Sequence, residues 1–225
     1  MFTRHLAFAV YLLIFICTNC AHSRQIRIAI VDTGININDP ELVFCKGLSK
    51  DFTDTGLEDT NGHGTNISFI IHNYLQGKNY CIIMVKVVNG VKGADKLQYM
   101  IDGLTYLVDL KPDIVNISLI GFGTYPDEYN AIRTLLDNKT VIVAAAGNNG
   151  MNLDEDCNVY PACYSNRIIT VGNLAYVGLR NSTSNYGKYV KRWELGTNIT
   201  AGGYTKSGTS QATALVTAKI ARSLK

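Results

Sequence analysis

Three short segments of the chain carry side chains that together suit nucleophilic catalysis. Asp32 ends an apolar run, His63 lies between two glycines, and Ser210 lies in the sequence Gly208-Thr209-Ser210-Gln211. Serine is a weak nucleophile until a base accepts its proton, and a carboxylate holds an imidazole base in the required tautomer. We therefore predict acyl transfer, with Asp32 orienting the base, His63 acting as the base and Ser210 as the nucleophile.

A fourth side chain with a catalytic use is that of Asn148, which follows the apolar segment 141–145. A side-chain amide in that place can donate a hydrogen bond to the oxyanion that forms on an attacked carbonyl. The backbone N–H of Ser210 would be the second donor. The motif Asp32-Thr33-Gly34 alone also occurs in aspartic proteases, but that class needs a second copy or a homodimer and an all-β chain.

Apolar strands and helical segments alternate along the chain. Strands are predicted over residues 26–32, 81–88, 113–119, 141–145 and 168–171, and helices over residues 63–74, 94–110, 129–136 and 211–224. Residues 46–62 are polar, which indicates a surface loop. Such alternation is typical of βαβ units and a parallel sheet covered on both faces. We predict an α/β fold with three layers, α/β/α, and a mostly parallel, doubly wound sheet whose strand carboxyl ends carry the site.

Composition excludes several classes of protein. The chain has 225 residues, of which 47% are hydrophobic and 17% charged, with a formal net charge of +3. A hydrophobic share this high is enough to bury a core, which excludes a disordered protein. The basic residues are scattered, so no nucleic-acid partner is expected. The length fits one domain, which we assign to residues 23–225.

The N-terminal segment has the pattern of a secretory signal peptide, assigned to residues 1–22. Arg4 and His5 precede an apolar run over residues 6–16, and short polar and small residues follow it. The run is shorter than the roughly 20 apolar residues that span a bilayer. Retention as a membrane anchor, lipidation at Cys17 or Cys20, and a buried N-terminal element are the alternatives. We expect a secreted or extracytoplasmic protein.

Four further cysteines would mature in an oxidising compartment, where cysteines usually pair. They are Cys45, Cys81, Cys157 and Cys163, and they allow three pairings. Cys157 and Cys163 lie six residues apart around a loop that contains a proline, which favours Cys157–Cys163 together with Cys45–Cys81. Four free buried thiols are the alternative.

The chain resembles the subtilisin-like serine proteases, the subtilase family, from about residue 26 to the last predicted helix. The order Asp, His, Ser is that of subtilisin, whereas unrelated folds use other orders. Beyond the three catalytic segments, the matching motifs are Asn116-Ile117-Ser118-Leu119, Ala144-Ala145-Ala146-Gly147-Asn148, Tyr160-Pro161-Ala162 and Ser184-Asn185-Tyr186-Gly187. The resemblance implies a secreted, monomeric serine endopeptidase that acts on proteins or peptides and needs no cofactor.

The resemblance also implies the substrate-binding residues. Residues that would pair with the substrate backbone are Ser118, Leu119 and Ile120, and residues that would line the primary pocket are Ala145, Ala146, Gly147 and Val159. A branched Val159 would make that pocket shallow, which favours small or medium apolar side chains. The acidic residues upstream, Asp154, Glu155 and Asp156, would instead favour basic ones.

Several residues depart from the family pattern. Ile120 stands where a glycine is usual, Ser68 and Phe69 replace a small residue and a glycine, and Ala214 replaces a proline. Residues 74–80 are too few for the family's calcium loop, so no metal is expected there. The acidic residues of segment 51–59 are expected to form a solvated loop rather than a weak calcium site. The altered cleft, together with a short N-terminal segment that leaves no propeptide, supports an alternative function: a peptide-binding domain with weak or no proteolytic activity.

Overall fold

The computed structural model describes residues 24–89 and 97–224. The predicted signal peptide and the first residues of the helix predicted at 94–110 lie outside these ranges. Of the described residues, no helix is both long and apolar enough to cross a membrane.

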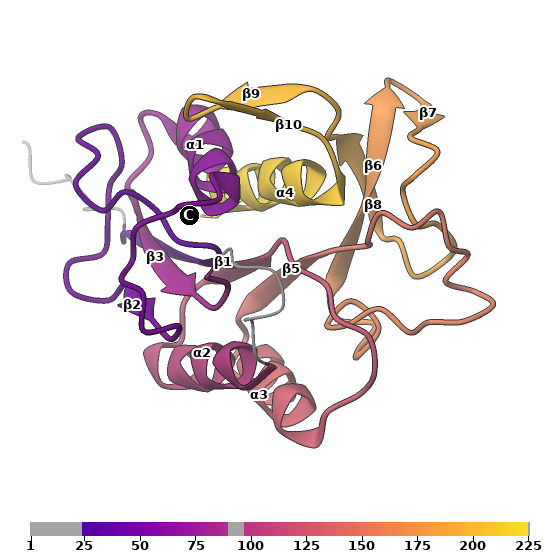
Figure 1. Ribbon diagram of the computed structural model, residues 1–225, viewed down its shortest axis with the longest axis horizontal. Helices are drawn as coiled ribbons and strands as arrows, with labels where there is room; N and C mark the ends of the chain where they lie inside the picture. Colours follow the sequence, from indigo (N-terminus) through magenta and orange to yellow (C-terminus); the bar gives the residue numbers. More distant parts are fainter. Residues whose placement is uncertain (1–23, 90–96, 225) are drawn as a thin grey trace, which may run out of the picture.

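A large, mostly parallel sheet forms the centre of the molecule (Figure 1). Its strands are β1 (Ile26–Asp32), β2 (Lys50–Asp51), β3 (Tyr80–Lys86), β4 (Ile114–Ile117), β5 (Val141–Ala145), β6 (Ile169–Tyr176), β7 (Leu179–Arg180) and β8 (Arg192–Leu195). The strand order is β2-β3-β1-β4-β5-β6-β7, with β8 also paired to β6. Of the strand pairs described in this sheet, only β6–β7 is antiparallel. A separate antiparallel hairpin is formed by β9 (Ile199–Ala201) and β10 (Tyr204–Lys206).

Helices cover both faces of the sheet. Figure 1 shows α1 (His63–Leu75) and α4 (Thr209–Ser223) on one face, and α2 (Leu97–Leu110) and α3 (Pro126–Asp137) on the other. Alternate residues of β1 enter the two cores: Ile28 and Ile30 pack in the core with α1 and α4, while Ala29 and Val31 pack in the core with α2 and α3. This explains why β1 is apolar without alternation, because both of its faces are buried. The predicted three-layer α/β fold is confirmed.

The order of the strands brings the catalytic segments together. Strands β1, β4 and β5 are neighbours, and parallel pairing places their carboxyl ends at one edge. Asp32 is the last residue of β1, Ser118 follows β4, and Asn148 lies shortly after β5. Helices α1 and α4 begin at His63 and Thr209, which places His63 and Ser210 in the first turns of these helices.

Candidate active site

His63 and Asp32 form a close pair. His63 Nδ1 lies 2.6 Å from Asp32 Oδ1, and the backbone N–H of Thr33 donates to the same carboxylate oxygen at 2.8 Å. Asp32 is fully buried at the end of β1. A buried carboxylate that accepts the Nδ1 proton leaves Nε2 of the imidazole unprotonated, so that this nitrogen can act as a base.

Burial and the neighbouring charge of Asp32 shift the pKa of His63 in opposite directions. Burial lowers the pKa of His63, whereas the charge of Asp32 and the hydrogen bond to it raise that pKa. Lys206 lowers it further and Asp59 raises it, and the pKa of His63 ends above its ordinary value of 6.5.

Asp59 holds the start of α1 against the end of β1, a role that the sequence analysis did not assign. Its Oδ1 accepts hydrogen bonds from Thr33 Oγ1 and from the backbone N–H of Asn61 and Gly62. Its Oδ2 accepts from both the backbone N–H and the hydroxyl of Thr65, at 2.8 and 2.7 Å. No N-cap pattern marks this residue in the sequence, because Asp59 lies three residues before the N-cap, which is Gly62.

The Ser210 hydroxyl donates to the backbone carbonyl of Ser118 at 2.8 Å. In return, Ser118 Oγ donates to the Ser210 carbonyl at 3.2 Å, and Asn116 Nδ2 donates to Ser118 Oγ at 2.9 Å. Thr217 Oγ1, two turns further along α4, donates to Asn116 Oδ1. These bonds join the first turns of α4 to the end of β4. In this structure the single hydroxyl proton of Ser210 is therefore directed to Ser118, and it has to be redirected to the imidazole before it can be transferred.

Asn148 also contacts the N-terminus of α4. Its Oδ1 accepts a hydrogen bond from the backbone N–H of Thr209 at 2.9 Å, which identifies this atom as the oxygen. The amide nitrogen Nδ2 is then free to donate elsewhere. The backbone N–H of Ser210 lies in the first turn of α4, where helix amides lack carbonyl partners within the helix. The Asn148 amide and the Ser210 N–H thus both lie at the end of α4 that carries the Ser210 hydroxyl.

The segments assigned to substrate binding flank Ser210. The backbone groups of Leu119 and Ile120 make no hydrogen bond to any other described residue, whereas Gly121 pairs with Tyr160 through two bonds of 2.9 Å. Ala145 and Ala146 are buried, and the carbonyl of Ala146 accepts from Asn185 Nδ2 at 2.7 Å.

Val159 exposes none of its surface and packs in a buried cluster with Ala146, Leu153 and Val190. Two acidic residues upstream of it accept hydrogen bonds, one from another loop and one from within the same loop. Asp154 accepts from the backbone N–H of Lys188, and Glu155 accepts from Asn152.

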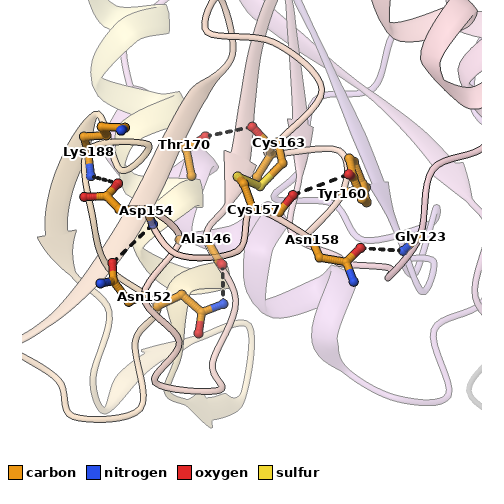
Figure 2. Close-up of a disulfide and its surroundings, with 12 residues drawn as sticks. Gly123, Ala146, Asn152, Asp154, Cys157, Asn158, Tyr160, Cys163, Thr170 and Lys188 are labelled. Carbon is orange, nitrogen blue, oxygen red and sulfur yellow. Dashed lines mark hydrogen bonds between the residues drawn. A yellow bond between two sulfur atoms is a disulfide. The ribbon is translucent and has the colours of Figure 1, made fainter.

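Among the residues that the structure describes, two disulfides are present, Cys45–Cys81 and Cys157–Cys163. Figure 2 shows the second one at the base of the loop that carries Tyr160 and Asn158. Asn158 Oδ1 accepts a hydrogen bond from the backbone N–H of Gly123, so this loop is also tied to the segment after β4 (Figure 2). Across residues 24–89 and 97–224, no three His, Cys, Asp or Glu side chains are grouped in a way that could hold a metal ion.

Comparison with known proteins gives consistent matches over nearly the whole chain. The subtilase family matches residues 23–225. The "Major intracellular serine protease" of Bacillus subtilis (strain 168) is 30% identical over 190 residues, which cover 78% of this chain and 59% of that protein. The "Minor extracellular protease Epr" of the same organism is 32% identical over 204 residues, covering 84% of this chain and 30% of that protein.

Solved structures agree with this assignment. A cold-adapted subtilisin-like serine proteinase superposes with a TM-score of 0.71 at 27% identity, covering 88% of this chain and 74% of that one. The chain spans little more than half of the first of these curated relatives, and the relatives include both intracellular and extracellular proteases. The match over residues 23–225, together with the parallel sheet and the Asp32–His63 pair, shows that the chain belongs to the subtilase family.

Proposed function

We propose that the protein is a serine endopeptidase that works through an acyl-enzyme formed on Ser210. The observation that carries this proposal is the 2.6 Å contact between the His63 imidazole and the buried Asp32 carboxylate. It lies at the sheet edge where Ser118 contacts Ser210. The family match supports the same reaction class.

In the proposed mechanism, Ser210 Oγ attacks the carbonyl carbon of a peptide bond and its proton passes to His63 Nε2. Asp32 accepts the Nδ1 hydrogen bond and stabilises the imidazolium. Asn148 Nδ2 and the Ser210 N–H donate to the oxyanion. His63 then gives the proton to the leaving amine. In the second half of the reaction, His63 accepts a proton from water, which attacks the acyl carbon, and then returns a proton to Ser210 Oγ as the acyl group leaves.

The segment 118–120 would hold an extended peptide. Because Leu119 and Ile120 have unpaired backbone groups among the described residues, a substrate strand can add to this edge through main-chain hydrogen bonds. Such pairing is independent of side chains, so it suits protein and peptide substrates in general.

We also propose that the protein is exported, with residues 1–22 as a cleaved signal peptide. The two disulfides support this location, because disulfides persist in oxidising compartments. N-terminal sequencing of the protein recovered outside the cell tests it. A start near residue 23 is expected, and an intact N-terminus in a membrane fraction would indicate an anchor instead.

The second candidate function is a peptide-binding domain with little or no turnover. It is favoured by the orientation of Ser210 Oγ toward Ser118 and by Ile120 in the cleft. The two candidates share the binding segment and differ only in the chemistry at Ser210.

The deciding experiment compares folded wild type with Ser210→Ala and Asn148→Ala. Wild type is expected to react with a fluorophosphonate and to hydrolyse peptides, and Ser210→Ala to lose both. Asn148→Ala is expected to keep labelling while turnover falls about 10²–10³-fold, the loss that removal of one oxyanion donor causes in subtilisin. Binding of peptide by folded wild type without labelling or turnover would establish the second candidate.

A further inference from the structure

The reacting carbonyl of a substrate has a restricted location in this site. It must reach both Ser210 Oγ, which contacts the Ser118 carbonyl, and the amide of Asn148, which is tied to Thr209. The substrate residue that bears this carbonyl, here called the acyl residue, therefore lies between segment 118–120 and segment 145–148.

The side chain of Ile120 extends from the first of these segments toward the second. Gly147 has φ +97°, and a Cβ placed on it would lie only 3.2 Å from Ile120 Cδ1. The terminal methyl of Ile120 thus lies close to Gly147, the residue that directly precedes Asn148, on the side where a side chain of residue 147 would stand. The backbone next to Ile120 is held in place, because Gly121 pairs with Tyr160 through two hydrogen bonds.

The space behind Ile120 is filled by buried apolar side chains. Ile120 packs against the cluster of Ala146, Leu153, Val159 and Val190, together with the Cys157–Cys163 disulfide. Ala146 and Val159 are fully buried. A side chain that enters between the two segments therefore meets Ile120 first.

We propose that Ile120 is a specificity-determining residue that restricts the acyl residue to a small side chain, such as that of glycine or alanine. This inference rests on the proposed endopeptidase function and names its substrate class. It assigns the restriction to Ile120, whereas the resemblance to the family pointed to Val159. A side chain that is larger than that of alanine by one or more methylenes has to displace Ile120 from Gly147. Misfits of this size change specificity by about 10–200-fold.

The test uses internally quenched peptides that differ only at the acyl residue, which is Gly, Ala, Leu or Phe. kcat/KM is measured for wild type, for Ile120→Ala and for Leu179→Ala, with active sites counted by fluorophosphonate labelling. Leu179→Ala is the matched control, because it truncates an exposed aliphatic side chain on β7, outside the site. Wild type is expected to favour Gly and Ala over Leu and Phe by at least about tenfold.

Ile120→Ala is expected to raise the ratio of Phe to Ala cleavage by at least about tenfold, and Leu179→Ala to leave it unchanged. If Ile120→Ala does not fold, Ile120→Val, which lacks only the δ-methyl, is expected to shift the ratio in the same direction. An enzyme that labels but cleaves after Phe as fast as after Ala would overturn the inference alone. A folded Ile120→Ala variant that labels but keeps the wild-type ratio of Phe to Ala cleavage would also overturn the inference alone. Folded wild type without labelling or turnover would overturn the proposed function and the inference with it.

Discussion

At the scale of single residues, the proton on His63 is governed by burial and by three charged neighbours. Burial and Lys206 lower the pKa of His63, while Asp32 and Asp59 raise it, and the net direction is upward. A base that must be neutral to accept a proton loses activity as the pH falls through its pKa. We therefore expect the acid limb of the pH profile to lie above pH 6.5, the ordinary pKa of this side chain.

Two substitutions should move this limb in opposite directions. Asp32→Asn removes the largest cause that raises the pKa of His63, so the limb should shift to lower pH while kcat falls by about 10⁴-fold. Lys206→Met removes the positive charge that lowers the pKa, so the limb should shift to higher pH with activity largely kept. The measurement is kcat/KM against pH for the three proteins, and a shift of both variants in the same direction would contradict the explanation.

At the scale of elements, the first turn of α1 depends on Asp59. Five hydrogen bonds from Thr33, Asn61, Gly62 and Thr65 converge on its carboxylate, and the residue as a whole is only 8% exposed. Burial raises the pKa of Asp59, but these hydrogen bonds outweigh it and the pKa ends below its ordinary value of 3.8. The carboxylate therefore stabilises the fold at pH values above 3.8, and this contribution disappears as the pH falls through the lowered pKa.

We expect Asp59→Asn to lower the free energy of unfolding by about 1–3 kcal/mol at pH 7, since an amide cannot accept all of these bonds. The difference from wild type should shrink when both proteins are unfolded with urea well below pH 3.8. Glu58→Gln, an exposed neighbour, serves as the control and should match wild type at both pH values. An equal loss for Asp59→Asn at both pH values would show that its charge is not what stabilises α1.

Elements with a strong local pattern could be predicted from the sequence, and others could not. The strands at 26–32 and 141–145 have the predicted bounds, because each is a buried apolar run ended by turn residues. Helix α3 begins at Pro126, three residues before the prediction, since proline suits the first helical position. Strands β2 and β7 have two residues each, and β8 is charged and partly exposed, so their pairing depends on neighbours that only the fold supplies.

At the scale of the whole molecule, the same distinction applies to the site. The catalytic side chains could be proposed from residue type, because acyl transfer needs an acid, a base and a nucleophile. Ile120 lies close to Gly147, and Thr33 donates a hydrogen bond to Asp59; each of these contacts joins segments far apart in sequence. No local pattern encodes such contacts, since they arise where β4 pairs with β5 and where the loop before α1 packs against the end of β1.

The two disulfides close loops of very different size and should stabilise the molecule unequally. Cys45–Cys81 spans 36 residues, including the whole of α1, whereas Cys157–Cys163 spans only 6. Closing the longer loop removes more conformational freedom from the unfolded chain, by about 4 kcal/mol against about 2 kcal/mol for the shorter one. Cys45 and Cys81 are also buried in the core beneath α2, which adds to their effect.

Replacing each pair by two alanines should therefore separate stability from specificity. The Cys45/Cys81 variant should show the larger fall in free energy of unfolding, measured by urea denaturation at neutral pH. The Cys157/Cys163 variant should lose less stability but change the preference for the acyl residue, because its loop pairs with Gly121 next to Ile120. The prediction is contradicted in both parts if the Cys157/Cys163 variant loses more stability than the Cys45/Cys81 variant and keeps the wild-type preference for the acyl residue. The short disulfide would then stabilise the whole fold instead of holding the substrate site locally.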